Sequence, residues 1–496
     1  MSICNAFDFF YLVKHSHKQL KKFRVILLLT SLSAAWACVM QKERTKSLYH
    51  LQNTVTYIPG DDSLSIMTAS ATEDGNAEAG YKYLMEGNAF SSGIPVNMYK
   101  FLLKLKDSKL ARLAGYNKYT LNDFVVFKND KGRLTAIPGC LHCHAQQFNN
   151  SYVVGLGNSY SNFKGRPATY IKLIKAAMNS IYGKTSDEWK TAERAFEAMQ
   201  ILDGKIQTEM QGPTPAQKIA EITASHRDPV TLKFRADTEY FSVPNIVIPE
   251  DPPALWISKK RKALTVNAMR QGGVLKHIVS TSLLTLKDTS EAREIYNHSI
   301  DVWAYIKTLK PPPYPFAINK NLAEKGRKIF VQTCSYCHGT YGEKEHYPNK
   351  IIPPNIIGTD SLMWKYFIKY TGYTEWFNKS WFAALEPKSF TNPQRGYVPP
   401  PLDGVWVTAP YLHNGSVPTI KNVLNSKTRP KYWKRNFNKE EYDYEKLGWR
   451  YKTLSKPGGK KMYNTDIPGY GNYGHTFGDH LTDAERKAVI EYLKTI

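Results

Sequence analysis

The sequence predicts a mainly α-helical protein with long loops, divided into two lobes that follow one another along the chain. Three observations lead to this fold class: one five-residue motif occurs twice, each lobe closes with a segment of helical periodicity, and the alternation typical of strands is sparse. Many Gly, Pro, Asn and Tyr residues lie between the periodic segments and predict long loops. With 496 residues and 42% hydrophobic content, the chain can bury two cores.

The repeated motif is Cys-x-x-Cys-His. Its first copy is formed by Cys140, Cys143 and His144, and its second copy by Cys334, Cys337 and His338. Two thiols at this spacing can add to the vinyl groups of one haem while the histidine binds the iron. A zinc site, a redox dithiol and structural cysteines are the alternatives, but zinc ribbons place their cysteine pairs about 15–20 residues apart, whereas these pairs lie almost two hundred residues apart. We therefore predict two covalently bound haem c groups in tandem cytochrome c-type domains; a structural calcium ion stays open, because no ligand pattern for it can be read.

Residues 1–37 have the organisation of a secretory signal peptide. Basic residues at 14–24 precede an apolar run from Val25 to Ala37, and this run is shorter than the roughly 20 residues that span a bilayer. Ala35-Trp36-Ala37 fits an ordinary cleavage site, while Ala37-Cys38 also resembles a lipoprotein box, so Cys38 is either a lipid-anchor site or an incidental residue of the signal. We expect export to the periplasmic or extracellular side of a bacterial membrane, with lipid attachment as an open alternative.

Residues 38–125 carry no chemical motif, and we interpret them as a mostly helical N-terminal extension packed on the first lobe. The first haem domain, residues 126–310, closes with a helix at 289–309, where a Thr or Ser can cap the start and apolar residues recur at near-helical spacing. Pro311 to Pro313 forbid the continuation of this helix and form a stiff connector.

The second haem domain, residues 311–496, repeats this organisation. A leading helix from Leu322 to Thr333 runs directly into the second motif, and a capping box that starts at Thr482 predicts the last helix. The endings of the two lobes also match, as YIKTL at 305–309 and YLKTI at 492–496. A helix before the haem motif and a helix at the end are the walls that a small cytochrome c domain places around its haem.

The chain is strongly basic, with a formal net charge of +24. Removal of the predicted signal, with its five basic residues and Asp8, leaves +20. Such a charge is typical of nucleic-acid binding, but an exported haem protein seldom meets nucleic acid, so we expect none as a partner. The basic surface instead favours an acidic redox partner protein or an anionic membrane surface.

The ligand on the far side of each iron decides between electron transfer and catalysis, because a six-coordinate haem passes electrons and an open one binds O₂ or peroxide. For the first haem, no His or Met occurs between Phe148 and Ala177, which favours an open iron. Met178, His226 and His277 could still fold in from further along the chain.

For the second haem, His413 and His475 are the leading candidates, because the residues around them fix a tight backbone. Either histidine could instead hydrogen-bond a propionate or a loop carbonyl. The remaining downstream candidates are His346, His480, Met363 and Met462.

Two consecutive segments, PPLDGVW at 400–406 and TAPYLHNGSVPT at 408–419, resemble a signature of dihaem cytochromes related to the rubber oxygenase RoxA. These proteins belong with the bacterial dihaem cytochrome c peroxidases and MauG. Segments 310–316, 337–342 and 471–475 resemble the same family. The resemblance implies two cytochrome c domains in contact, with peroxide or O₂ chemistry at the first haem and electron storage at the second.

The resemblance also implies roles for individual residues. Trp256 lies in a Pro-Pro-Ala-Leu-Trp stretch similar to the one that places a tryptophan between the haems, although plain packing at the domain interface explains it equally well. The peroxidases ligate the second haem with a Met, and Lys427 stands at that position here, so a His ligand is implied. His475 resembles the family's late Gly-His-x-Phe-Gly position better than His413 does, and Arg270 would suit peroxide.

The peroxidases carry a further His soon after the first haem motif, and this chain has none there, which favours an open first haem. We therefore predict an exported dihaem oxidoreductase of peroxidase or oxygenase type, with Trp256 and Arg270 as its catalytic residues. Peroxide or O₂ would react at the first haem, and the second haem would relay electrons. The alternative is a dihaem electron-transfer cytochrome without a substrate of its own.

Overall fold

The computed structural model describes residues 74–98, 124–129, 131–165, 168–459 and 462–496. The predicted signal peptide at 1–37, Cys38 and most of the predicted extension at 38–125 lie outside these residues. Within the described part of the chain, no helix is both long enough and apolar enough to cross a bilayer.

The prediction of a mainly α fold is wrong. The structure is 39% helical and 12% strand, and its strands form several small sheets. All of the described strands are only two to five residues long, which is too short for an alternating pattern to stand out in the sequence. Strand β2 (Phe124–Lys128), one of the two five-residue strands, has four consecutive buried residues rather than an alternation, because both of its faces are covered.

The elements follow one another as two groups that divide near residue 310. The first group contains α2 (Ala77–Glu86), β1 (Ile94–Pro95), β2, β3 (Leu134–Pro138), α5 (Leu141–His144), β4 (Ala145–Phe148), β5 (Ser151–Val154), α6 (Ala168–Tyr182), α7 (Asp187–Leu202), α8 (Ala216–Ser225), η2 (Leu255–Lys260), β6 (Arg270–Gly272), α9 (Val274–Val279), η3 (Ser280–Leu284) and α10 (Thr289–Thr308). The second group contains α11 (Lys320–Thr333), α12 (Ser335–His338), α13 (Pro354–Ile357), α14 (Leu362–Lys369), α15 (Gly372–Asn378), α16 (Trp381–Ala384), β7 (Ser389–Thr391), η4 (Val405–Val407), α17 (Ile420–Val423), η5 (Ser426–Thr428), β8 (Tyr432–Lys434), β9 (Tyr442–Asp443), β10 (Gly448–Trp449), β11 (Lys452–Thr453), β12 (Tyr463–Asn464) and α18 (Asp483–Leu493).

Three predicted helices are confirmed, at α10, α11 and α18. The side chain of Asp288, rather than a Thr or Ser, caps α10. The capping box of Thr482 and Glu485 is formed as predicted. The proline run follows directly after the end of α10, where the prolines prevent further helix.

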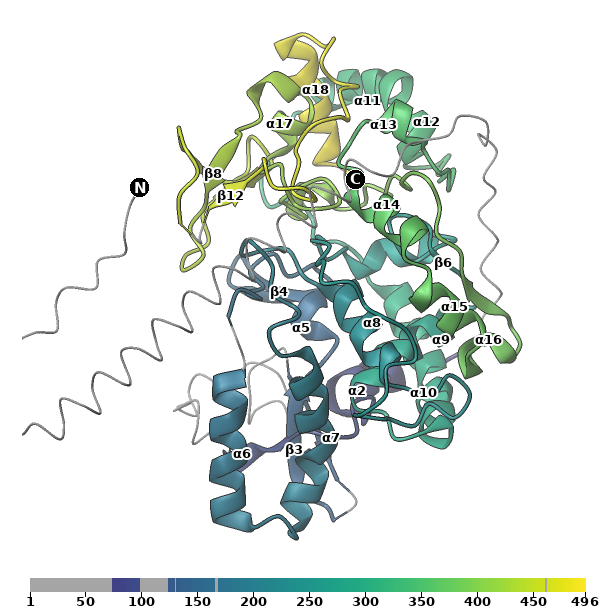
Figure 1. Cartoon of the computed structure of the whole chain (residues 1–496). Helices are drawn as coiled ribbons and strands as arrows, with labels where there is room; N and C mark the ends of the chain where they lie inside the picture. Colours follow the sequence, from purple (N-terminus) through teal and green to yellow (C-terminus); the bar gives the residue numbers. More distant parts are fainter. Residues whose placement is uncertain (1–73, 99–123, 130, 166–167, 460–461) are drawn as a thin grey trace, which may run out of the picture.

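Each lobe is held by one crossing of two helices, α2 on α10 and α11 on α18 (Figure 1). A glycine lies at the point of closest approach in both crossings. A Cβ atom on Gly80 would lie 1.9 Å from the carbonyl oxygen of Asp301, and one on Gly326 would lie 1.9 Å from that of Ala488. The two lobes therefore repeat the same kind of helix crossing, with a glycine at its closest point. Helix α2, which falls inside the predicted N-terminal extension, is one of the two helices of the crossing in the first lobe.

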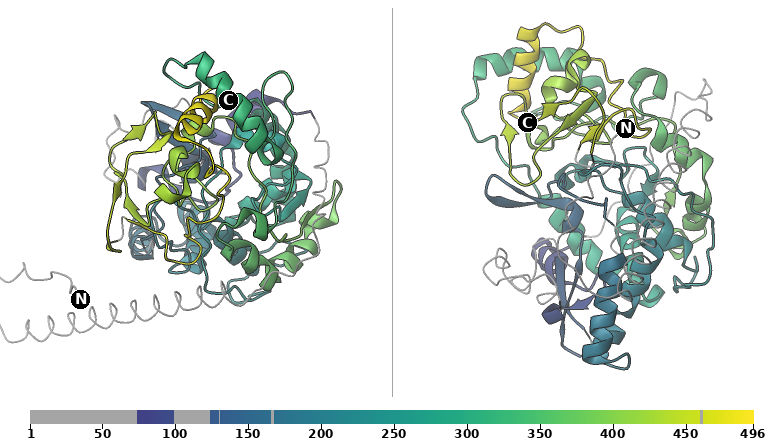
Figure 2. Two further views of the ribbon diagram at one scale, coloured as in Figure 1. Left: turned by 90° about the horizontal axis from the view of Figure 1, so that it is seen from above. Right: turned by 60° about the vertical axis from the view of Figure 1, so that its left-hand side comes forward.

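The two lobes share part of their interior. Strand β6 pairs antiparallel with β7, so residues 270–272 and 389–391 form one ladder. One buried apolar cluster contains residues of both groups, among them Leu283 and Ile295 from the first and Phe367 and Phe377 from the second. In Figure 1, α14, α15 and α16 lie along α9 and α10, while α11, α17 and α18 form the opposite end; the side view of Figure 2 shows the same stacking. The C-terminal lobe is thus packed directly against the first lobe.

We predict that Gly326→Ala and Gly80→Ala each destabilise the protein, because a methyl group at either site meets a backbone carbonyl that cannot move aside. Overpacking of this kind costs about 1–3 kcal/mol. Thermal unfolding measures the effect, and Gly458→Ala is the matched control, since a Cβ atom there meets no atom within 4 Å. Equal melting temperatures for Gly326→Ala and Gly458→Ala would contradict the packing account.

Candidate haem-binding sites

Each Cys-x-x-Cys-His motif forms a single helical turn. The amide of His144 donates to the carbonyl of Cys140 at 3.1 Å, and the amide of His338 donates to that of Cys334 at 3.0 Å. The turn brings two thiols and one imidazole of each motif close together. None of the four motif cysteines forms a disulfide, and all four are part-buried.

Burial raises the pKa of Cys140 to about 11 and that of Cys334 to about 12, which favours the protonated thiol of both residues at neutral pH. Among the described residues, no group of three or more His, Cys, Asp or Glu side chains could hold a metal ion by itself. The chemistry of the motifs therefore fits thioether attachment better than the zinc or redox alternatives.

The histidine of each motif is oriented by the backbone carbonyl of a proline. Nδ1 of His144 lies 3.1 Å from the oxygen of Pro253, and Nδ1 of His338 lies 2.8 Å from that of Pro400. Because a carbonyl oxygen can only accept, Nδ1 carries the proton and Nε2 keeps its lone pair for a metal. Burial also lowers the pKa of both histidines, which favours the neutral ring. Both sites thus have the donor set that haem iron requires on one side.

The first motif adjoins a mostly apolar cavity. Cys140 forms part of its wall, and residues of α2, β2, α9 and α10 form most of the rest, among them Leu84, Val125, Ile278 and Val302. A flat, mostly apolar group attached at Cys140 fits a lining of this kind.

His475 faces the histidine of the second motif. The ring centroids of His338 and His475 are 6.1 Å apart, and the ring planes are inclined by 58°. Two metal–imidazole bonds of about 2.0–2.1 Å in line place the two nitrogens about 4 Å apart and the ring centres about 6 Å apart. The observed spacing fits one metal ion between the rings.

The local backbone at His475 supports this position. His475 follows Gly474 and has a φ of 46°, and its amide donates to the carbonyl of Ile357 at 2.7 Å. Its Nδ1 is buried without a hydrogen-bond partner among the described residues. Burial lowers the pKa of His475 to about 3, so the ring is neutral and able to bind a metal.

The other candidates for the second haem have different surroundings. His413 stacks on Tyr397 at 4.4 Å, and its carbonyl accepts from the amide of Asp251. Met363 is buried in the apolar cluster that both lobes share, and Met462 lines a separate pocket near β12. The backbone of His346 pairs with that of Thr340.

Each of the three distal candidates for the first haem has contacts of its own, although Nε2 of His226 and Nδ1 of His277 are buried without a hydrogen-bond partner in the described residues. Met178 is buried between α6 and α7. Nδ1 of His226 lies within 3.2 Å of two backbone carbonyl oxygens. Nε2 of His277 lies 2.8 Å from the carbonyl of Gln271, and its ring stacks on Phe377 at 5.0 Å. In the described residues, no histidine ring contacts the ring of His144 as His475 contacts that of His338.

Trp256 lies between the two motifs. It is 1% exposed, and its Nε1 donates to the carbonyl of Asp403 at 2.8 Å. A Cβ atom on Gly155 or on Gly404 would lie 3.4 Å from its ring. Gly155 donates its amide to the carbonyl of His144, so Trp256 contacts the surroundings of the first motif on one side and those of the second motif on the other.

Arg270 lies on β6 and is associated with Tyr373 rather than with a motif. Its Nη2 lies 3.3 Å from the hydroxyl of Tyr373, and its guanidinium lies over the same ring. Its Nε is buried without a partner in the described residues. The structure shows no hydrogen bond between Arg270 and the described residues of either motif.

The sequence reasoning missed the carbonyl groups of Pro253, Pro400 and Asp403. A signal for them exists: each carbonyl that accepts from a motif histidine belongs to a Pro-Pro pair followed by a tryptophan, PPALW at 252–256 and PPLDGVW at 400–406. Because this pattern occurs in both lobes, the two motif histidines are oriented by the same kind of backbone contact.

Residues 396–434 match a family model described as RoxA-like, cytochrome c-like. The matched segment includes Pro400 and Asp403. The chain is also similar to two curated proteins of Sinorhizobium fredii (strain NBRC 101917 / NGR234). Uncharacterized protein y4iJ is 32% identical over 253 residues, which cover 38% of this chain and 41% of the relative. Uncharacterized protein y4iM is 25% identical over 232 residues, which cover 42% of this chain and 51% of the relative, so the chain spans about half of the length of these relatives or less. The family match supports a cytochrome of RoxA-like type, with haem c as its cofactor.

Proposed function

We propose that this chain is an exported dihaem c-type oxidoreductase that activates peroxide or O₂ at its first haem and uses its second haem as an electron relay. The RoxA-like cytochrome c match supports a haem redox function. The observation that carries the finer proposal is an asymmetry: a second imidazole faces His338, and none of the described residues places one opposite His144.

Each motif would hold one haem. Cys140 and Cys143 would attach the first haem, and Cys334 and Cys337 the second. The prolyl carbonyls fix the rings of His144 and His338 so that Nε2 can bind iron. Haem c supplies reversible one-electron chemistry, and an open axial position on its iron binds peroxide or O₂.

The chain connects the two motif histidines by hydrogen bonds and short stretches of backbone. His144 donates to Pro253, and three residues later Trp256 donates to Asp403. Three residues before Asp403, Pro400 accepts from His338. The distances are 3.1, 2.8 and 2.8 Å. This connection supports Trp256 as a relay residue for electrons, because every through-space step is a hydrogen bond.

The remaining parts of the proposal concern Arg270 and the partners. Arg270 is a part-buried cation on β6 whose Nε has no partner in the described residues, and we propose that it polarises a peroxide or O₂ substrate. The basic charge of the chain favours an acidic redox partner protein. Export and a lipid anchor at Cys38 stay part of the proposal.

The second candidate function is a dihaem electron-transfer cytochrome without a substrate of its own. The His338–His475 pair favours it for the second haem, because paired imidazoles leave iron no open position. The two functions differ only in whether an iron bound by His144 keeps an open position for peroxide or O₂.

We predict two covalent haems per chain. Intact-mass measurement of the mature protein should show two added haem masses, and Cys140→Ala combined with Cys143→Ala should remove only one. A single haem in the unaltered protein would contradict the assignment of one haem to each motif.

His475→Ala should convert a low-spin haem signal to high spin and shift the reduction potential of that haem, because it removes one of two facing imidazoles. His413→Ala is the matched control and should leave the spin state unchanged. Absorption and magnetic spectra of both variants measure the change. The ligand assignment is wrong if the control variant, and not His475→Ala, becomes high-spin.

The reduced protein should bind one carbon monoxide per chain, at the haem attached to Cys140 and Cys143. It should also change its spectrum on addition of peroxide or O₂. Titration of the reduced protein with carbon monoxide measures the stoichiometry. If neither haem binds carbon monoxide at any potential, the catalytic proposal fails and the electron-transfer cytochrome takes its place.

Trp256→Phe should slow electron exchange between the haems without preventing carbon monoxide binding, because it removes the indole N–H that reaches Asp403. Trp406→Phe is the matched control: it also removes a buried indole hydrogen bond, to Pro312, outside the proposed connection. Both variants should lose a similar stability, about 0.5–1.5 kcal/mol for the hydrogen bond. Flash photolysis of the half-reduced carbon monoxide complex measures the exchange, and equal rates in both variants would exclude Trp256 as a relay.

A further inference from the structure

Arg429 binds the loop that carries His475. Its Nη1 donates to the carbonyls of Asn472 at 2.7 Å and Gly474 at 2.6 Å, and its Nη2 donates to the carbonyl of His475 at 2.9 Å. The carbonyls of Gly474 and His475 belong to the two peptide groups that flank the α-carbon of His475. One side chain therefore fixes the backbone on both sides of this histidine.

The remaining donors of Arg429 bind the end of helix α17. Nε donates to the carbonyl of Asn422 and Nη2 to that of Val423, both at 3.0 Å. These residues end the helix, where backbone carbonyls have no partner within the helix. A guanidinium has five N–H donors, and here all five are directed at carbonyls, so the side chain connects α17 rigidly to residues 472–475.

The loop depends on this side chain because it has little backbone pairing of its own. Residues 471–475 belong to no helix or strand. In the described residues, no backbone amide donates to the carbonyl of Asn472, Gly474 or His475. Arg429 thus supplies the hydrogen bonds that a helix or a sheet would supply elsewhere.

The start of the loop has a separate attachment. The side-chain amide of Asn414 donates to the carbonyls of Gly469 and Gly471, each at 2.9 Å, and the hydroxyl of Ser416 donates to that of Gly471 at 3.0 Å. Both Asn414 and Ser416 are buried. Residues 469–471 are therefore held in place without Arg429, whereas residues 472–475 are not.

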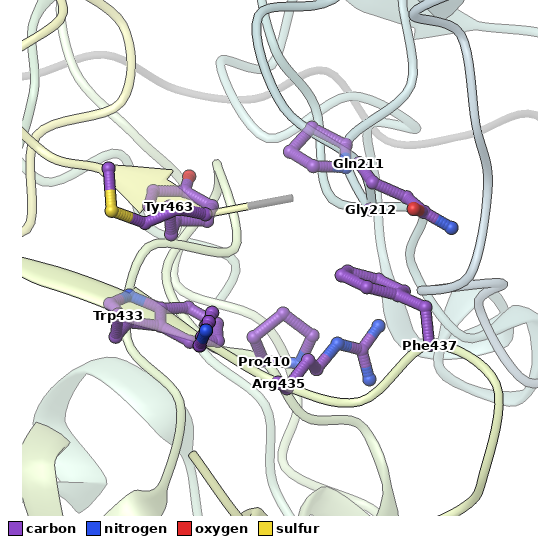
Figure 3. A pocket seen from close by; sticks show the side chains of 10 residues that line it. Gln211, Gly212, Pro410, Trp433, Arg435, Phe437 and Tyr463 are labelled. Carbon is purple, nitrogen blue, oxygen red and sulfur yellow. The ribbon is translucent and has the colours of Figure 1, made fainter. Parts of the chain in front are cut away.

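Strand β8, which begins three residues after Arg429, gives the arginine a fixed base. The ring of Trp433 in this strand stacks on that of Tyr463 in β12, with the centroids 5.1 Å apart, as Figure 3 shows. The indole donates to the carbonyl of Ser416, and the hydroxyl of Tyr463 donates to that of Asn414. The same frame therefore supports Arg429 and the start of the loop.

We propose that Arg429 is a positioning residue for the second haem: it holds His475 opposite His338 by fixing the two peptide groups that flank His475. The inference rests on the ligation of the second haem by both histidines, as proposed above. Loss of the three hydrogen bonds to residues 472–475 lets this segment move, and the imidazole moves with it.

Carbon monoxide measures how firmly His475 is held, because the gas and the imidazole compete for one position on the reduced second haem. Arg429→Lys keeps the charge but cannot reproduce the planar donor fork. Its weaker hold on His475 raises the apparent carbon monoxide affinity of that haem by the same factor. Since a hydrogen bond from a charged group is lost, we expect a rise of at least about tenfold, measured by titration of the reduced, haem-loaded, full-length protein.

Two variants serve as references. His475→Ala removes the competing imidazole and should show the largest rise. Arg194→Lys is the matched control, because Arg194 also donates to backbone carbonyls, those of Ser91 and Thr285, but in the first lobe. It should leave the carbon monoxide affinity of the second haem unchanged, although it loses stability for the same reason as Arg429→Lys.

Asn472→Ala tests the same loop with a smaller change and serves if Arg429→Lys does not fold. The side-chain amide of Asn472 donates to the carbonyl of Pro430 at 2.9 Å and is a further attachment of the loop beside Arg429. Its removal should raise the carbon monoxide affinity of the second haem at least about twofold, as expected for a neutral hydrogen bond.

Three results would overturn the inference. If His475→Ala raises the affinity but folded Arg429→Lys, or Asn472→Ala in its place, leaves it unchanged, the ligation stands and the role of Arg429 falls. If Arg194→Lys raises the affinity as much as Arg429→Lys, the effect is a general loss of stability. If His475→Ala itself changes nothing, the ligation by His475 fails, and the role of Arg429 fails with it.

Discussion

The arrangement of both haem-binding sites depends on one hydrogen bond that occurs twice, from the ring of a motif histidine to the carbonyl of a proline. The ring of a proline fixes its backbone angle φ, which restricts the movement of the carbonyl that accepts this bond. The bond selects the tautomer of His144 and His338 and leaves Nε2 of each ring for iron. The same two backbone stretches also carry Trp256 and Asp403, which connect the lobes. In the proposed function, this repeated hydrogen bond would orient both iron ligands, and the stretches that carry it would set the distance between the two haems.

Two further constraints keep this device in place. At Gly80 and Gly326, the crossing helices approach each other more closely than any residue with a Cβ atom would permit. Each crossing forms one wall of its lobe. The lobes then share an apolar cluster and the β6–β7 ladder. Because packed cores resist deformation, the two motifs are held at a fixed separation. In the proposed function, electron exchange between the two haems would depend on this fixed separation.

The sequence predicted the features that depend on short spacing. The two motifs, the ends of α10 and the capping box of α18 could all be read from neighbouring residues. The features that depend on distant contacts could not. Helix α2 packs on α10 although more than two hundred residues separate them, and strands of a few residues leave no alternation to detect. Spacing alone also left His413 and His475 equivalent, and only the packing of the chain brings one of them to His338.

The central claim is that the two motifs hold haems of different coordination: paired imidazoles at His338, and one imidazole at His144. Electron paramagnetic resonance of the resting ferric protein, with the spins counted against total iron, tests it most directly. The account predicts two irons per chain, one low-spin with two nitrogen axial ligands and one high-spin or water-bound. Two low-spin irons with strong ligands on both faces would contradict it.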